Sequence, residues 1–250
     1  MSSTTTYITN KCYGNDFGSQ YKYLIDILLM CYANGYEFVY NKITHMENNY
    51  DNDPAFIEKM ENLMNLRPHF TPFGDESLNN AFITIYDMTV KNVISANMDY
   101  YVTDENLGRI KQMFWANKDR TNLFDNNGKT NVVIYIPEDT NTAYGPIYMK
   151  MIQILRDNQS TLIQNGDLLF HIYSRGSIDD FQSYNAEDII LHINEDIEST
   201  FIHMVAADIF ILTNNLFCYS AALLSNGIVY NYSNENPSRN TWISFYTFWH

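Results

Sequence analysis

Four short apolar runs in the last third of the chain decide its fold class: LLFHIY (Leu168–Tyr173), IILHI (Ile189–Ile193), IFILT (Ile209–Thr213) and IVYNY (Ile228–Tyr232). Segments with the apolar spacing of helices separate these runs. Because strands that alternate with helices form βαβ units, the pattern predicts a parallel sheet covered by helices. An earlier apolar run, Asn131–Ile136, has the continuous character of a strand buried on both faces and is expected to join the same sheet.

The first half of the chain also starts as a βαβ unit. Tyr7–Asn10 and Glu37–Tyr40 are predicted strands, and the helix between them is expected over about Gln20–Asn34, with Gly35 as its C-terminal cap. Further elements are predicted with weaker patterns. Three of them are helices: one over about Pro54–Asn65, one over about Asp104–Asn117 with Asp104 as cap, and one that Pro146 opens and that ends near Asn158. The other two are strands, at Ala81–Tyr86 and Lys91–Ser95.

A polar segment, Lys118–Thr130, is the natural boundary between the two halves. We therefore expect two Rossmann-like domains, residues 1–125 and residues 126–250. At 250 residues, the alternative is a single α/β domain with an N-terminal elaboration.

Composition excludes some classes of function. The formal net charge is −14 and only 15 residues are Lys or Arg, which argues against a nucleic-acid surface because phosphate contacts come from those side chains. No apolar run approaches the roughly 18 residues of a membrane span, and the N-terminus has no apolar signal segment, so a soluble, cytoplasmic chain is expected. The three cysteines have neither disulfide nor zinc spacing, and no metal site is predicted.

The last third also resembles a known family. Its segments are YSRGSIDDF (Tyr173–Phe181), HINEDIESTFIHMVAADIFIL (His192–Leu212) and TNNLFCYSAALLSNGIVY (Thr213–Tyr230). Over about Phe170–Tyr232 the chain resembles the donor-binding half of fucosyltransferase-like, inverting GT-B glycosyltransferases, a group with viral and algal members. The resemblance implies that residues 1–125 form the acceptor-side domain and residues 126–250 the nucleotide-sugar donor domain.

The resemblance implies transfer of a sugar from a nucleoside-diphosphate sugar to a glycan or glycoprotein hydroxyl, without a metal or other cofactor. GDP-fucose is the first donor that it suggests. The alternative is a relative that has lost catalysis and binds a glycan, a nucleotide or a protein partner.

In the resembling enzymes, a serine-rich turn between a strand and a helix holds the phosphates of the donor, and Thr213–Ser220 stands at that position. Asn215, Leu216 and Cys218 replace the expected serines. A plain helix cap is the structural alternative for this turn. The residues predicted to bind the donor, with Thr200 near the nucleotide base at the start of a helix, are Ser174, Thr200, Thr213, Asn214, Asn215, Phe217 and Ser220.

Members of this family carry a His-x-Arg-Arg motif after the first strand of the second domain, and its arginine neutralises the departing diphosphate. This chain instead has Glu138 and Asp139 there, which are the nearest candidates for a general base. A cation from elsewhere is then needed, and Arg175 is the first choice because it follows the run Leu168–Tyr173. The other candidates are Arg109, Lys150 and Arg239.

Two further loops carry candidate residues. The run Gly14–Gly18 resembles the acceptor-side loop of the family through Gly14, Asn15 and Gly18, although two glycines before a helix also fit an ordinary turn. Asp51-Asn52-Asp53 has the Asp-x-Asp form that other glycosyltransferases use to hold a metal, but it lies in an Asn-rich loop before Pro54, which favours a turn. Glu195, Asp196 and Glu198 precede a helix expected from about Ser199, where acidic residues suit the helix dipole.

Overall fold

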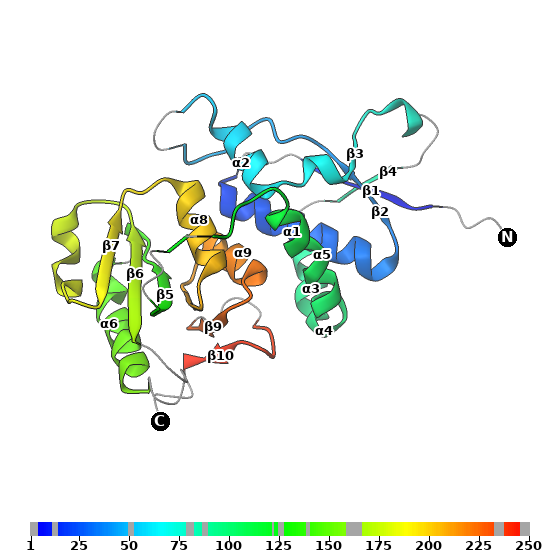
Figure 1. Ribbon diagram of the computed structural model, residues 1–250. Helices are drawn as coiled ribbons and strands as arrows, with labels where there is room; N and C mark the ends of the chain where they lie inside the picture. The colour runs from blue at the N-terminus through cyan, green and yellow to red at the C-terminus, as the bar shows by residue number, and fades with distance from the viewer. Residues whose placement is uncertain are drawn as a thin grey trace. The chain divides into compact units, whose positions relative to one another are not determined.

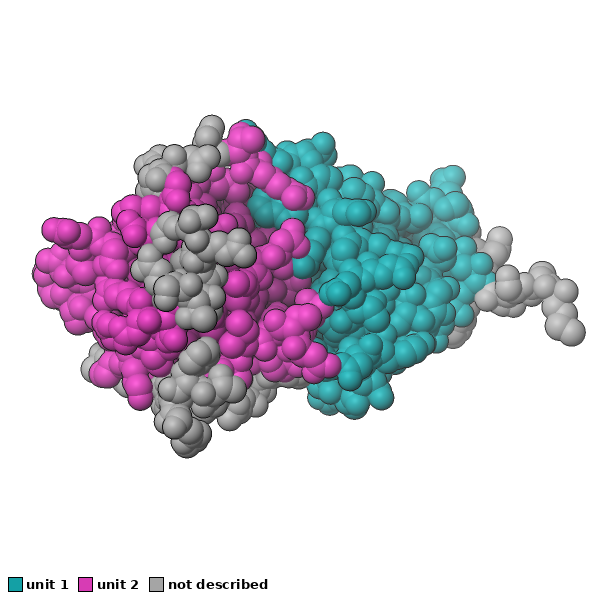
Figure 2. All heavy atoms as spheres, turned by 60° about the horizontal axis from the view of Figure 1, so that its bottom comes forward, with its two compact units in different colours: residues 1–119 teal, residues 120–250 magenta. Residues whose placement is uncertain are grey.

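The computed structural model describes residues 5–11, 15–49, 53–78, 83–86, 90–121, 123–124, 128–138, 141–158, 167–232 and 238–245. The chain divides into two compact units, Met1–Asp119 and Arg120–His250 (Figure 2). The division falls inside the polar segment Lys118–Thr130. Each unit is an α/β structure with a parallel sheet (Figure 1).

The first unit is built on a four-stranded sheet in the order β3-β2-β1-β4. Its strands are β1 (Tyr7–Asn10), β2 (Glu37–Tyr40), β3 (Thr71–Pro72) and β4 (Ile83–Tyr86). All the pairs are parallel. The helices are α1 (Phe17–Asn34), α2 (Phe56–Met64), α3 (Val90–Ala96), α4 (Met98–Tyr101) and α5 (Asp104–Trp115), with short 3-10 turns at η1 (Arg67–His69) and η2 (Glu76–Leu78).

The second unit contains a six-stranded, all-parallel sheet in the order β10-β9-β8-β5-β6-β7. Counted from β5, this is the Rossmann strand order, and the first unit shows its first four positions. The prediction of an α/β chain with two Rossmann-like units is therefore confirmed. The elements are β5 (Thr130–Tyr135), α6 (Asn141–Asp157), β6 (Leu168–Ser174), η4 (Ile178–Tyr184), β7 (Ile189–Ile193), α8 (Ile197–Ala206), β8 (Ile209–Leu212), α9 (Leu216–Leu224), β9 (Ile228–Asn231) and β10 (Ile243–Ser244).

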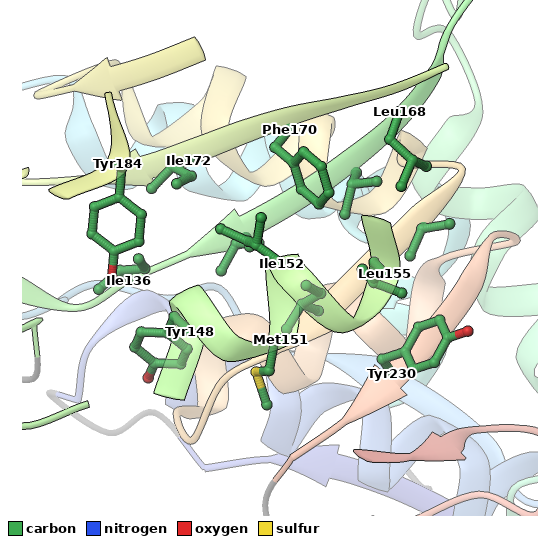
Figure 3. Packing of buried hydrophobic residues seen from close by; sticks show 14 of the residues in the cluster. Ile136, Tyr148, Met151, Ile152, Leu155, Leu168, Phe170, Ile172, Tyr184 and Tyr230 are labelled. Atoms are coloured by element: carbon green, nitrogen blue, oxygen red, sulfur yellow. The ribbon is translucent and has the colours of Figure 1, made fainter. Parts of the chain in front are cut away.

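Helices cover both faces of this sheet. On one face, Met151, Ile152 and Leu155 of α6 pack against Phe170 and Ile172 of β6, and all five side chains are buried (Figure 3). On the other face, α8 and α9 lie against β5 and β8. This double covering explains why the strands read as continuous apolar runs and not as alternating ones.

Several predicted boundaries need correction. Lys91–Ser95 is not a strand but part of the helix α3, because Val90 and Ile94 are buried one helical turn apart while Val93 is exposed. The helix α6 does not open at Pro146: it begins at Asn141 and includes the proline, at the loss of one backbone donor. The N-cap of α5 is Thr103, whose side chain accepts from the amide of Asn106, and not Asp104.

Two more helices start earlier than expected because an aspartate caps each of them. Asp16 accepts from the backbone amide of Ser19, so α1 begins at Phe17. Asp196 accepts from the amides of Glu198 and Ser199, so α8 begins at Ile197. The predicted cap at the other end of α1 is confirmed, since Gly35 adopts the left-handed conformation with φ 67°.

Candidate functional site at the carboxyl edge of the second sheet

The strand order of the second unit places a reversal point between β5 and β8. From β5 the chain continues to β6 on one side, and later returns to β8 on the other side. In such sheets, ligands bind outside the carboxyl ends of the strands at this point. Three segments lie at this edge: residues 136–138 after β5, residues 175–177 after β6 and residues 213–215 after β8.

The turn between β8 and α9 uses its polar side chains within the fold. The buried Thr213 hydroxyl donates to the carbonyl of Tyr135 at 2.8 Å and lies 3.2 Å from the sulfur of Cys218. Asn215 caps α9 by accepting from the amide of Cys218 at 2.7 Å. Burial raises the pKa of the Cys218 thiol to about 12, which keeps it protonated at neutral pH. Since these side chains are bonded within the fold, the groups that remain for a ligand are the backbone amides in the first turn of α9.

The other predicted donor-binding residues differ in their surroundings. Asn214 is exposed at the edge, and the partly exposed Phe217 packs its ring against Tyr135 and Phe201 at centroid distances of 5.2 and 5.3 Å. Ser220 is fully buried and its hydroxyl donates to the carbonyl of Leu216 within α9. Thr200 is buried in α8. The fold thus brings Asn214 and Phe217 to the edge and places Ser220 and Thr200 inside.

The loop after β6, which carries the predicted cation Arg175, runs beside one predicted base, Glu138. The Ser174 hydroxyl donates to the carbonyl of Ile136 at 2.6 Å and so joins the ends of β6 and β5. Gly176 has φ 114°, and a Cβ atom there would lie 3.4 Å from the carboxyl group of Glu138. The exposed Glu138 therefore packs against the residue that follows Arg175. Asp139 lies outside the described residues.

The sequence reasoning placed Asn194 at the start of a candidate lining segment, Asn194–Thr200, but gave it no role of its own. It follows β7, has φ 61°, and its side chain makes two hydrogen bonds with the backbone of Gly176. The amide of Gly176 donates to Oδ1 at 3.0 Å, and Nδ2 donates to the carbonyl of Gly176 at 2.9 Å. A signal was present, because an asparagine directly after a predicted buried strand suits the left-handed turn that ends it.

A cluster of three histidines lies beneath this edge, on the face covered by α8. Nδ1 of His171 is 3.0 Å from Nε2 of His192, and the Tyr173 ring stacks on His192 at 4.3 Å. Nε2 of His203 donates to the carbonyl of Leu123 at 2.7 Å. Its Nδ1 and the Tyr173 hydroxyl are buried and make no hydrogen bond within the described part of the chain.

Neighbouring groups determine which nitrogens of the cluster carry protons. Asp208 accepts from both the backbone and side-chain nitrogens of Asn131, so the Oδ1 atom of Asn131 faces Nε2 of His171 at 3.2 Å. His171 therefore donates there and accepts from His192 at Nδ1. Burial, aided by the nearby His192 and His203, lowers the pKa of His171 to about 4. Burial also lowers the pKa of His192, against the opposing influence of Glu195.

The predicted acceptor-side loop belongs to the first unit. Gly14 lies outside the described residues. The carbonyl of Asn15 accepts from the side chain of Gln20 at 2.8 Å. Gly18 is not a loop residue but lies buried in the first turn of α1. Of the three residues, only Asn15 is therefore seen in a loop.

Within the described ranges, no three His, Cys, Asp or Glu side chains are arranged to hold a metal ion. Asp51 and Asn52 lie outside those ranges. Asp53 accepts from the amide of Ala55, the N-cap residue of α2, and pairs with Lys59 in that helix at 2.6 Å. None of the described helices is long and apolar enough to span a membrane.

No known family profile matches the sequence, and no curated protein matches it in sequence. Among solved structures, the chain is similar to the fucosyltransferase NodZ from Bradyrhizobium, with 8% identity and a TM-score of 0.43 over 95% of this chain and 98% of that one. A NodZ α-1,6-fucosyltransferase soaked with GDP-fucose gives 10% identity and a TM-score of 0.48 over 94% and 97%. The E. coli heptosyltransferase WaaC gives 11% identity and a TM-score of 0.41 over 96% and 92%.

Proposed function

We propose that this chain transfers a sugar from a nucleoside-diphosphate sugar to a hydroxyl of a glycan or glycoprotein. The observation that carries the proposal is the reversal point between β5 and β8, where the first turn of α9 meets the carboxyl edge of the sheet. A crevice at such a point, beside a helix N-terminus, suits a diphosphate. The resemblance over Phe170–Tyr232 suggests the reaction class and makes GDP-fucose the first donor to test.

In the proposed reaction, the acceptor oxygen attacks the anomeric carbon as the bond to the diphosphate breaks, and a base takes the hydroxyl proton. Glu138 and Asp139 are the candidates for this base. Arg175 would stabilise the negative charge that develops on the departing diphosphate. A single displacement of this kind inverts the anomeric carbon, and the proposed scheme uses no metal.

The carboxylate of Glu138 beside Gly176 also sets a requirement. It places negative charge next to the loop of Arg175, and a carboxylate repels a diphosphate at short distance. Turnover therefore depends on the guanidinium. A protein that binds nucleotide sugars without turnover is the alternative outcome to be tested.

The proposal is tested in two steps. A thermal-shift panel of GDP, UDP, ADP and their sugars first finds any ligand that binds the folded chain. Nucleotide release is then measured with candidate acceptors. Arg175→Ala should lower kcat by about a hundredfold with a smaller loss of nucleotide affinity, since the charge develops in the transition state.

Arg67→Ala is the matched control, because Arg67 is an exposed residue of the first unit that lies 3.8 Å from Glu58. It should leave kcat unchanged. Full activity of Arg175→Ala would reject the role of Arg175 and make Lys150 or Arg239 the next candidate. Binding of a nucleotide sugar without any release of nucleotide would favour the binding protein.

A further inference from the structure

We infer that Asn194 is a positioning residue that fixes the backbone on both sides of Arg175. This inference rests on the proposed function, in which Arg175 acts on the diphosphate of the donor. Asn194 reaches Gly176 through its side chain, with hydrogen bonds of 3.0 and 2.9 Å. Its own backbone amide donates to the carbonyl of Ser174 at 2.9 Å. One residue therefore binds the chain immediately before and immediately after Arg175.

The loop needs such a restraint because its backbone leaves the strand abruptly. Gly176 has φ 114°, a conformation that residues with a Cβ atom rarely adopt. A glycine in an exposed loop is mobile unless its polar groups are bound. The side chain of Asn194 satisfies both the amide and the carbonyl of Gly176, which holds the turn in one conformation.

Asn194 is itself fixed by rigid elements on both sides. It follows β7, which pairs with β6 up to Ser174 and Ile193. Two residues later, Asp196 caps α8 through the amides of Glu198 and Ser199. Through Asn194, the strand β7 and the helix α8 thereby fix the position of the Gly176 backbone. Precision of this kind matters, since a displacement of about 1 Å at a reacting group can cost roughly a hundredfold in rate.

Asn194→Gly is the variant that isolates this role. Glycine adopts φ 61° without strain and keeps the backbone hydrogen bond to Ser174, so only the two side-chain bonds to Gly176 are lost. We expect kcat to fall by about tenfold with little change in KM, because the guanidinium is misplaced while the binding edge remains. Asn194→Asp keeps the acceptor for the Gly176 amide but loses the donor. Its kcat should therefore lie between that of the unchanged protein and that of Asn194→Gly.

Asn48→Gly is the matched control. Asn48 is exposed in the first unit and has φ 63°, so the same substitution is made in the same backbone conformation. Its kcat should equal that of the unchanged protein. In the Arg175→Ala background, Asn194→Gly should cause no further loss, since it acts through Arg175. Additive losses in the double variant would overturn the inference.

A second readout does not depend on activity. Hydrogen exchange at the Gly176 amide should become at least about tenfold faster in Asn194→Gly, because this amide loses its acceptor. Trypsin should also cut faster after Arg175. Unchanged exchange would overturn the inference whether or not the protein is active. Faster exchange in a protein without any turnover would reject the proposed function while supporting the hold of Asn194 on the loop.

Discussion

At the amino edge of the six-stranded sheet, charged side chains hold the residues that precede the strands, whereas neutral hydroxyl and amide groups join the strand ends at the carboxyl edge. Asp208, before β8, accepts from the backbone and side-chain nitrogens of Asn131 at 2.8 and 3.2 Å. Arg156 of α6 makes two hydrogen bonds to Asp188, before β7, at 2.7 and 2.6 Å. Strong, charge-assisted bonds of this kind serve stability.

The carboxyl edge is held by other means. The Ser174 and Thr213 hydroxyls donate to carbonyls at the end of β5, and Asn194 binds the backbone of Gly176. Neutral groups join the strand ends, and the charged residues Arg175 and Glu138 lie on the loops beyond them. Substitutions at the amino edge should therefore change folding, and those at the carboxyl edge should change ligand binding or turnover.

The largest effect is expected at the amino edge, at Gly227. A Cβ atom there would lie 2.1 Å from the carbonyl oxygen of Ala207 and 2.6 Å from that of Asp208. Gly227→Ala should lower the free energy of unfolding by about 3 kcal/mol or more, because the clash is with backbone that must move. Urea denaturation at neutral pH measures the change.

Gly108→Ala is the control for this prediction. Gly108 lies in α5 with nothing within 4 Å of an added Cβ atom. Alanine should therefore stabilise the helix by roughly 0.5–1 kcal/mol. A loss of stability at Gly227 no larger than a few tenths of a kcal/mol would mean that the amino edge is not tightly packed.

The second prediction concerns the polar chain that runs from Asp208 through Asn131 and His171 toward the carboxyl edge. The pKa of His171 is about 4 in the folded protein, below the ordinary histidine value of 6.5 that applies in the unfolded chain. As pH falls below 6.5, the unfolded chain binds a proton before the folded one does. The stabilising contribution is thus complete above pH 6.5 and is lost as pH falls toward 4, by roughly 3 kcal/mol in all.

His171→Phe removes this titration while keeping an aromatic ring beside Phe124. The measurement is the free energy of unfolding from pH 7.5 to pH 4 for both proteins. Over this range the free energy of unfolding of the unchanged protein should fall by roughly 3 kcal/mol more than that of the variant. Parallel curves would show that His171 does not differ in proton affinity between the two states.

The third prediction addresses the carboxyl edge. Asn215→Asp should weaken nucleotide binding by about tenfold, because a carboxylate is placed beside the proposed diphosphate. The free energy of unfolding should change by less than about 0.5 kcal/mol, since aspartate caps a helix as well as asparagine does. Calorimetric titration and urea denaturation give the two numbers. Unchanged affinity would return this turn to the role of a helix cap alone.

The smallest effect is expected from Arg156→Lys at the amino edge. Lysine cannot make the paired hydrogen bonds that Arg156 makes to Asp188, and it also loses the contact over the Phe170 ring. We expect a loss of about 1 kcal/mol in stability and no change in nucleotide affinity. Any fall in affinity from this variant would contradict the division of roles between the two edges.

The second sheet could be predicted from the sequence because each of its strands from β6 to β9 is a continuous apolar run between helical segments. Those runs appear at the predicted positions to within a residue or two. The first unit gave weaker signals. Val90, Val93 and Ile94 suit either a short strand or a helix, and only packing of Val90 and Ile94 against the fold decides for α3.

The contacts of the candidate site could not be predicted in the same way. Arg175 and Asn215 could be proposed from the sequence because they follow strands that meet at one edge. The bonds between Asn194 and Gly176 depend on two turns that are adjacent only once β6 and β7 pair. The histidine cluster likewise joins β6, β7 and α8, and no local pattern links those residues. Such long-range polar contacts become visible only in the folded unit.

The position of β5 has a consequence for the synthesis of the protein. β5 is the first strand of the second unit to leave the ribosome, yet it lies in the interior of the sheet between β6 and β8. Until Ile209–Ile211 has been made, the side of β5 that will pair with β8 has no partner, although Val132, Val133 and Ile134 are fully apolar. Open edges of this kind invite association between nascent chains. During synthesis the unit therefore exposes an apolar strand edge that its folded form hides between β6 and β8.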